Sequence, residues 1–190
     1  MIKVKRVFSG EKALEEVNTA CKYIVEFETT REGDTIYLFA PSKRKIKGYF
    51  ETEKGRLDFE SKDGRIAFKI SLKKPITMED AANIAFFVNE IGHLVEPPEK
   101  RDEAVDLKRA ELWFKVKRKR VVVTNEGALL VTARTGSLKK LREYHGEIKM
   151  HALTIKIEKY FDDTRFTIKG KLTIHKMRKI TGLIETFETI

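Results

Sequence analysis

The side chains of this sequence that could do chemistry are mainly basic ones, spaced two residues apart in its C-terminal part. Lys115, Lys117 and Lys119 alternate with apolar residues, and Trp113 shares their parity. Residues two apart point to the same face of a β-strand, so the spacing predicts a sheet with one apolar and one basic face. Lysines neutralise phosphates, and an exposed indole offers a surface on which a base can stack.

Three long segments, 111–124, 147–159 and 165–176, are predicted to be strands of this sheet. Arg118 and Arg120 break the alternation, which predicts a β-bulge. The expected partner is nucleic acid, preferably single-stranded, and an ordinary solvated face of a heat-adapted protein explains the same pattern equally well. The residues expected to bind nucleic acid are Trp113, Lys115, Lys117, Arg118, Lys119, Arg120, Lys156, Lys169, Lys171 and His175.

The distribution of charge favours a polyanionic partner. Residues 1–110 contain 21 Lys+Arg and 20 Asp+Glu, whereas residues 111–190 contain 18 Lys+Arg and 9 Asp+Glu. Nearly all of the net charge of +10 therefore belongs to the C-terminal part. Heat adaptation explains a high charge content, but it does not explain this asymmetry.

A second candidate anion site lies between two predicted elements of the C-terminal half. Ser137 can cap a short basic helix over 138–144, which would expose backbone N–H groups and the positive end of the helix dipole. The spacing is not that of a nucleotide-binding P-loop, and a simple capped helix is the more ordinary explanation. The residues expected to bind the anion are Arg134, Gly136, Ser137 and Lys139.

Catalytic signatures are weak, so the sequence predicts no catalytic residue, no metal site and no cofactor. Glu90 and His93 form a single Glu-x-x-His pair, whereas di-iron bundles need two. The single cysteine, Cys21, has no cysteine partner and is expected to be a small buried residue.

Two other function classes stay open. A nuclease or polyphosphate hydrolase is the first alternative. Glu60-Ser61-Lys62 matches the Glu-x-Lys element of metal-dependent nucleases, a match that chance also explains in a chain this rich in Glu and Lys. Its further metal ligands would be Glu26, Glu28, Glu51 or Asp58. The second alternative is a protein-interaction module. Its contact surface would be the apolar helix expected at 78–94 or the tail 183–190, and the helix would bind a protein partner or a second copy of the chain.

The expected fold is α+β and predominantly antiparallel. Residues 1–97 are predicted to form a β-rich unit with a helix near the N-terminus, closed by a buried apolar helix at about 77–95. Within this unit Asp63-Gly64 predicts a hairpin turn, and Thr77 with Asp80 predicts a capping box at the start of the apolar helix. Residues 98–110 are predicted to be a charged connector, and 111–190 a basic antiparallel sheet unit that ends in a strand or extended arm over 180–190. No internal repeat is evident along the sequence.

The composition points to a cytoplasmic protein of a hyperthermophile. No apolar run approaches the roughly 20 residues needed to span a bilayer, and no apolar stretch follows the basic N-terminus as it would in a secretory signal. Charged residues make up 36% of the chain, the enrichment that heat-adapted proteins show.

Overall fold

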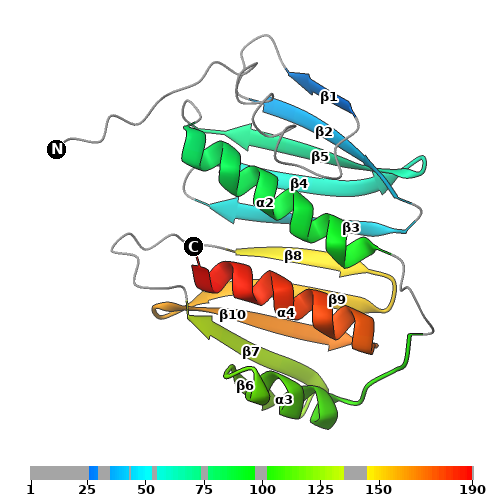
Figure 1. Cartoon of the computed structure of the whole chain (residues 1–190), viewed down its shortest axis with the longest axis vertical. Coiled ribbons are helices and arrows are strands. Elements are labelled where there is room, and N and C mark those ends of the chain that lie inside the picture. The colour runs from blue at the N-terminus through cyan, green and yellow to red at the C-terminus, as the bar shows by residue number, and fades with distance from the viewer. Residues whose placement is uncertain are drawn as a thin grey trace, which may run out of the picture. The chain divides into compact units, whose positions relative to one another are not determined.

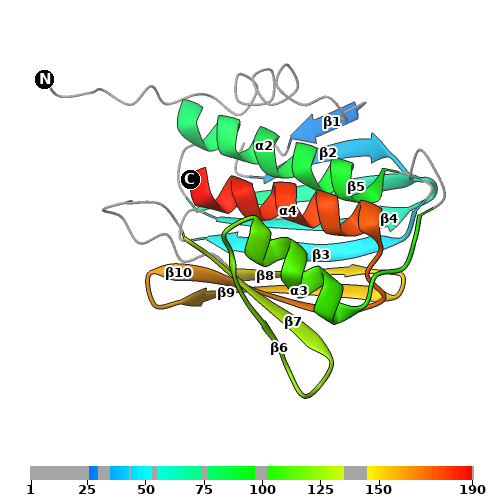
Figure 2. The same cartoon turned by 60° about the horizontal axis from the view of Figure 1, so that its bottom comes forward.

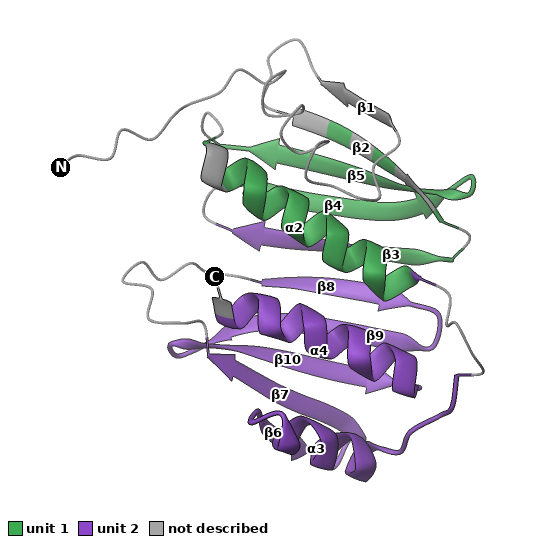
Figure 3. Ribbon diagram, in the orientation of Figure 1, with its two compact units in different colours: residues 1–47, 53–95 green, residues 48–52, 96–190 purple. Residues whose placement is uncertain are grey.

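The computed structural model of the chain describes residues 26–29, 35–42, 44–52, 55–73, 77–96, 102–134 and 145–189. These residues form an α+β fold dominated by antiparallel strand pairs. The chain divides into two compact units, coloured separately in Figure 3. Unit 1 comprises residues 1–47 and 53–95, and unit 2 comprises residues 48–52 and 96–190.

The described strands of unit 1 pair antiparallel with their neighbours β1–β2, β2–β5 and β5–β4. Their order across the sheet is β1-β2-β5-β4, and the first residues of β3 lie beside β4, where the Ile46 N–H donates to Ser61 Oγ over 2.9 Å. The predicted hairpin at Asp63-Gly64 is confirmed, since both residues have positive φ between β4 and β5. The strands are β1 Glu26–Thr29, β2 Thr35–Pro41, β3 Ile46–Thr52, β4 Gly55–Lys62 and β5 Arg65–Leu72.

Helix α2, Met78–Val95, occupies the range in which the sequence predicts an apolar helix. The predicted capping box forms at its start, because the Asp80 N–H donates to Thr77 Oγ1 over 3.2 Å and the Thr77 N–H donates to Asp80 Oδ2 over 3.0 Å. Val88, Ile91 and Leu94 are completely buried. The helix lies across one face of the strands of unit 1 (Figure 1).

Unit 2 has five strands of its own, in the order β6-β7-β10-β9-β8, with Gly48–Thr52 of β3 beside β8. Two helices, α3 Leu107–Val116 and α4 Ile174–Thr189, lie on one side of these strands (Figure 2). The strands are β6 Arg120–Val123, β7 Ala128–Arg134, β8 His145–Met150, β9 Leu153–Tyr160 and β10 Asp163–Gly170.

Aromatic side chains form the core of unit 2 between the strands and α4. The Phe187 ring of α4 meets Phe166 of β10 edge-on, with ring centroids 5.2 Å apart, and lies 6.1 Å from the ring of Phe50. Phe114 of α3 is also completely buried. Full burial of a phenylalanine contributes about 1.5–3 kcal/mol, so this cluster secures α3 and α4 to the apolar face.

The two units share one topology, although the sequence shows no alignable repeat. In each, the strands follow the order first, second, fifth, fourth and third, and a helix follows the fifth strand. The last hairpins also correspond in their buried positions: Phe59 and Phe68 of unit 1 match Ile157 and Phe166 of unit 2. The repeat was hidden because burial constrains only alternate residues, and the solvent-facing residues have diverged.

The prediction of a strand over 111–124 is wrong for its first part. Asp106 caps α3, since its carboxylate accepts from the Arg109 N–H over 2.8 Å, and the helix continues to Val116. Ala110 and Phe114 lie one helical turn apart and are both buried, whereas Leu112 and Val116, which alternate with the basic residues, remain exposed. Residues 107–110, placed in the charged connector by the sequence, are the first turn of this helix.

Two further predicted strands and the C-terminal tail also have a different secondary structure from the one predicted. Segment 147–159 is a hairpin of β8 and β9 that turns at His151-Ala152, where Ala152 has a φ of 60°. Segment 165–176 leaves β10 after Gly170 and enters α4 at Ile174. The predicted strand or arm over 180–190 is wrong, because α4 continues to Thr189 and buries Ile180, Leu183 and Phe187 at helical spacing.

The helix predicted near the N-terminus and the helix predicted over 138–144 lie outside the described residues. Among the described residues, no helix is both long and apolar enough to cross a membrane.

Candidate nucleic-acid interface

The strands of unit 2 have a face turned away from α3 and α4, here called the open face. On β10 the buried residues Thr164, Phe166 and Ile168 alternate with outward ones, as strand geometry requires. The outward positions of the five strands are Arg120, Val122, Leu130, Thr132, Arg134, His145, Glu147, Lys149, Thr154, Lys156, Glu158, Tyr160, Asp163, Arg165, Thr167 and Lys169.

Three arginines gather around Thr132 on this face and are called the arginine cluster: Arg120, Arg134 and Arg165. Thr132 of β7 pairs with Arg165 of β10 on one side and with Arg120 of β6 on the other. Strand spacing therefore places the Cα atoms of these two arginines about 10 Å apart. Arg134 lies two residues along β7, so it points to the same face. Neither Arg120 nor Arg134 forms an ion pair within the described part of the chain.

Two aromatic rings adjoin the cluster at the β9–β10 hairpin and are called the aromatic tip: Tyr160 and Phe161. The guanidinium carbon of Arg165 lies 3.5 Å from the centroid of the Tyr160 ring. Phe161 meets Tyr160 edge-on at 4.8 Å and is 79% exposed. A φ of 53° at Phe161 turns the chain at this point. The turn therefore presents a large ring to solvent directly beside the arginine cluster.

Arg165 is held by stacking and not by a salt bridge. Glu158 lies opposite it in the register, but the Glu158 carboxylate pairs with Lys156 at 2.6 Å. The Nε–H of Arg165 is buried and has no hydrogen-bond acceptor among the described residues. Its charge is therefore not neutralised by the described part of the chain, and the Tyr160 ring fixes the plane of the guanidinium group.

The lysines of the open face are more fully compensated than the arginines. Lys149 pairs with Glu147 at 3.0 Å, and Lys169 pairs with Glu126 at 3.2 Å. The carboxylate of Glu158 raises the pKa of Lys156, through a hydrogen bond and through charge attraction. These exposed pairs are weak and exchangeable, so the lysines remain able to attract an anion at longer range.

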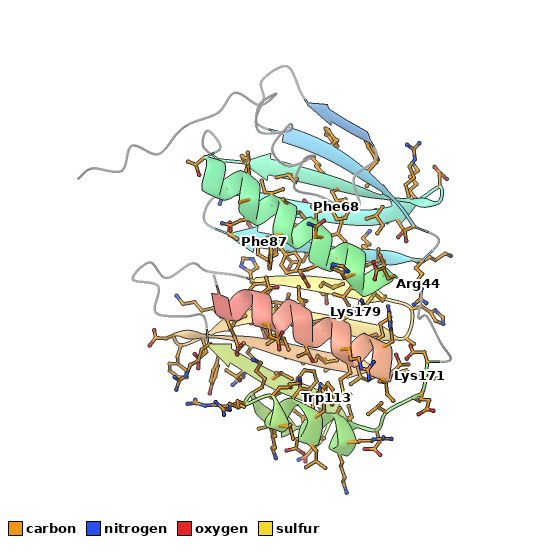
Figure 4. The ribbon with its side chains drawn as sticks, in the orientation of Figure 1. Arg44, Phe68, Phe87, Trp113, Lys171 and Lys179 are labelled. Atoms are coloured by element: carbon orange, nitrogen blue, oxygen red, sulfur yellow. The ribbon has the colours of Figure 1, made fainter. Side chains whose placement is uncertain are left out.

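Most of the residues predicted to form the basic face lie elsewhere. Trp113 and Lys115 are on α3, and Lys117 is its C-cap (Trp113 is labelled in Figure 4). The Trp113 indole N–H donates to Thr181 Oγ1 over 3.4 Å, and Lys117 Nζ lies 5.3 Å from the Trp113 ring centroid. Lys115 forms an ion pair with Glu111 at 2.5 Å. These side chains belong to the helical side of unit 2.

Four others of that set are structural or peripheral. The Lys119 ammonium forms an ion pair with Glu188 of α4, and its side chain is only 6% exposed. The His175 N–H donates to Asp102 Oδ1 over 3.0 Å, and its ring is 3.1 Å from the Glu96 carbonyl oxygen. Lys171 lies in the link between β10 and α4, and Arg118 in the turn after α3. Arg120, Lys156 and Lys169 remain on the open face as predicted residues.

Arg165, Tyr160 and Phe161 belong to the candidate site but not to the residues that the sequence predicted to bind. Tyr160 closes β9, and Arg165 shares the parity of Lys169 on β10, so strand alternation alone could have identified Arg165. Arg134 was predicted as part of the other candidate anion site, at the capped helix expected over 138–144. Of that proposed anion site only Arg134 falls among the described residues, and Gly136, Ser137 and Lys139 lie outside them.

The residues of the nuclease alternative are engaged in other contacts. Glu60 Oε1 lies 3.2 Å from Lys47 Nζ, and Asp58 pairs with Arg56 at 2.9 Å. The Ser61 hydroxyl donates to the Arg44 carbonyl over 2.7 Å. Within the ranges the structure describes, no three His, Cys, Asp or Glu side chains are grouped so that they could hold a metal ion.

The open face thus combines three arginines, two aromatic rings and several lysines that form weak ion pairs with glutamates. This arrangement can bind a phosphodiester chain and offer it a stacking surface, and it presents no grouped acid–base pair for hydrolysis among the described residues. Comparison with family models, with curated proteins and with solved structures finds no match to this chain.

Proposed function

We propose that the chain binds single-stranded nucleic acid across the open face of unit 2. In this proposal the arginine cluster holds the phosphates, the aromatic tip stacks on a base, and Lys156 and Lys169 supply long-range attraction. The proposal keeps the polyanion partner expected from the charge asymmetry, but it moves the binding residues from Lys115, Lys117 and Lys119 to the arginines.

One observation carries the proposal. Arg165 is stacked on Tyr160 at 3.5 Å and its Nε–H is unsatisfied, while Arg120 and Arg134 beside it have no ion-pair partner in the described part of the chain. Heat-adapted surfaces typically distribute their arginines into ion-pair networks. Asp163 lies opposite Arg134 and Glu158 opposite Arg165 in the register, but neither carboxylate forms an ion pair with these arginines among the described residues. Three gathered arginines that lack such ion pairs support a role in binding an external anion.

The exposed rings favour a single strand over a duplex. A base can stack on Phe161 or Tyr160 only when its face is uncovered, which is the ordinary state of unpaired bases. Each stacked base contributes about 1–3 kcal/mol without sequence preference. The expected behaviour is therefore tight but sequence-tolerant binding, weaker for a duplex of the same length.

The test is fluorescence anisotropy with labelled oligonucleotides across a salt titration. The variant Arg120→Ala/Arg134→Ala/Arg165→Ala removes the arginine cluster. The matched control, Lys108→Ala/Lys115→Ala/Lys117→Ala, removes the same charge from α3 in the same unit.

Loss of three phosphate contacts lowers the slope of log affinity against log salt by about 2, at about 0.7 per contact for a single strand. The control variant is expected to keep nearly the wild-type slope. If both variants lose affinity equally, only net charge matters and the open face is not the site. If the wild-type protein does not bind at low salt, the function is not nucleic-acid binding.

A further inference from the structure

The helical side of unit 2 carries an apolar groove between α3 and α4, on the side opposite the arginine cluster. The groove has a volume of about 350 Å³. Its lining is Val105, Arg109, Leu112, Trp113, Val116, Ile174, Met177 and Arg178. These residues come from two helices of one unit and from the segment that precedes α3.

The wall formed by α3 is unusually exposed for apolar side chains. Leu112 is 64% exposed and Val116 is 79% exposed, and they lie four residues apart, on one stripe of the helix. Trp113 stands between them and is anchored by its hydrogen bond to Thr181 of α4. The stripe is therefore fixed in place, and its burial would require a further element outside the described residues.

The groove has basic residues at its margins. Arg109 of α3 and Arg178 of α4 line it from opposite sides, and neither forms an ion pair with a described residue. Lys117 lies over the Trp113 ring at the end of α3. The nearby Glu111 carboxylate is engaged by Lys115. An occupant of this groove would therefore meet an apolar floor between positive charges.

We infer that the groove between α3 and α4 docks an acidic amphipathic helix of a protein partner. Two helices with an apolar channel between them accept a third helix along their length, by ridges into grooves. Leucine-type side chains of the partner would cover Leu112, Trp113 and Val116. Glutamate or aspartate residues beside that apolar stripe would face Arg109 and Arg178.

Other occupants fit less well. A second copy of this chain would bring α3, whose exposed Lys108, Arg109 and Lys115 would repel the same charges on the first copy. A small carboxylic acid could meet Arg109 or Arg178, but it would leave the long stripe of Leu112 and Val116 uncovered. In the test, sedimentation detects a second copy of the chain, and decanoate represents the small carboxylic acid.

The full chain provides its own probe, because Trp113 is its only tryptophan. The ligands would be two synthetic helical peptides of about 18 residues with leucine at i, i+3, i+4 and i+7, identical except that one has glutamate and the other lysine beside the leucine stripe. Trp113 emission and the anisotropy of the labelled peptide would be recorded together. Sedimentation would report the oligomeric state, and decanoate would serve as the small anionic amphiphile.

The acidic peptide is expected to bind with a blue shift of Trp113 emission and at least roughly tenfold more tightly than the basic peptide. The variant Arg109→Glu/Arg178→Glu should reverse the preference, a result that loss of folding cannot produce. Val116→Lys should weaken binding, whereas Val122→Lys, which alters a comparably exposed apolar residue of β6, should not.

Equal binding of both peptides, or an unchanged preference in Arg109→Glu/Arg178→Glu, would overturn the inference. It would also be overturned if neither peptide binds, if the groove is filled by self-association, or if decanoate alone produces the blue shift. The inference is independent of nucleic-acid binding, because none of these variants alters the arginine cluster.

Discussion

The Arg165 guanidinium covers the Tyr160 ring, with its central carbon 3.5 Å from the ring centroid. The Phe161 ring meets the same Tyr160 ring edge-on. Tyr160 and Arg165 come from the two strands of one hairpin, so their contact does not depend on distant parts of the chain. This pair makes the β9–β10 hairpin the centre of the proposed nucleic-acid interface.

Arg165→Lys should weaken single-strand binding, although it keeps the charge. Lysine lacks the planar group that stacks on Tyr160 and that contacts phosphate through two nitrogens. Affinity is expected to fall roughly tenfold, or about 1.4 kcal/mol, with little change in the salt slope. Arg165→Ala should lose the same stack and also reduce the slope. Wild-type affinity in Arg165→Lys, measured by anisotropy, would show that the stack has no role in binding.

Trp113 fluorescence should stay unchanged when the protein binds an oligonucleotide. The indole belongs to α3 and donates to Thr181 of α4, so it lies on the helical side of unit 2. A titration that saturates by anisotropy should therefore leave the tryptophan emission within noise. Strong quenching would place the nucleic acid on α3 and restore the original prediction for Trp113, Lys115 and Lys117.

Lys119→Ala should destabilise the protein more than Lys115→Ala. Lys119 is 6% exposed and pairs with Glu188, so its removal leaves a partly buried carboxylate without its partner. The expected loss is about 2 kcal/mol in the free energy of unfolding. Lys115 pairs with Glu111 on the surface, and its loss should cost about 0.5 kcal/mol or less. Chemical denaturation of both variants measures the difference, and equal values would contradict a structural role for Lys119.

Gly170→Ala should cost far more stability than Gly64→Ala. Both glycines have positive φ, 111° and 76°, so both substitutions introduce backbone strain of about 1–2 kcal/mol. At Gly170 an added Cβ would also lie 2.2 Å from the Ala152 carbonyl oxygen, whereas at Gly64 nothing lies within 4 Å. Thermal melts should show Gly64→Ala slightly destabilised and Gly170→Ala severely so. Similar melting temperatures would mean that the backbone relaxes around Ala152.

Oligonucleotide affinity should be constant from about pH 6 to about pH 9, because arginines stay charged throughout this range. Lys156 follows the same rule. Its raised pKa, caused by Glu158, keeps the ammonium charged to higher pH than an ordinary lysine, so its charge is lost only well above this range. Anisotropy at fixed ionic strength tests this. A fall in affinity between about pH 6 and pH 7 would contradict a site whose charge comes from arginines.

Sequence patterns predicted the parts of the fold that local rules determine. The hairpin at Asp63-Gly64 and the capping box of Thr77 and Asp80 each depend on residues within one turn, and both are present. The segment after Asp106 could have been recognised as well, since an N-cap aspartate and the Glu111–Lys115 spacing are helical signals. Strand alternation outweighed them because Leu112, Phe114 and Val116 recur at every second position, the period of a strand, although only Phe114 is buried in the helix.

Other features could not be obtained from local pattern. The cross-strand row that joins Arg165 to Arg120 depends on which strands are neighbours, and β10 pairs with β7 across a long stretch of intervening chain. The strand assignment of 180–190 was wrong for a related reason. Its residues Thr181, Ile184 and Thr186 favour strands intrinsically, but burial of Ile180, Ile184 and Phe187 on one helical face outweighs that preference.

Strand β3 is divided between the units, since Ile46 and Lys47 belong to unit 1 and Gly48–Thr52 to unit 2. The polypeptide therefore passes from one unit to the other three times, and no single cut separates two complete halves. A fragment that begins after residue 95 would lack Phe50, one of the rings around Phe187, and would leave β8 with an unprotected edge. During synthesis, too, the segment 48–52 cannot pair with β8 until that strand, about 100 residues later in the chain, has emerged from the ribosome.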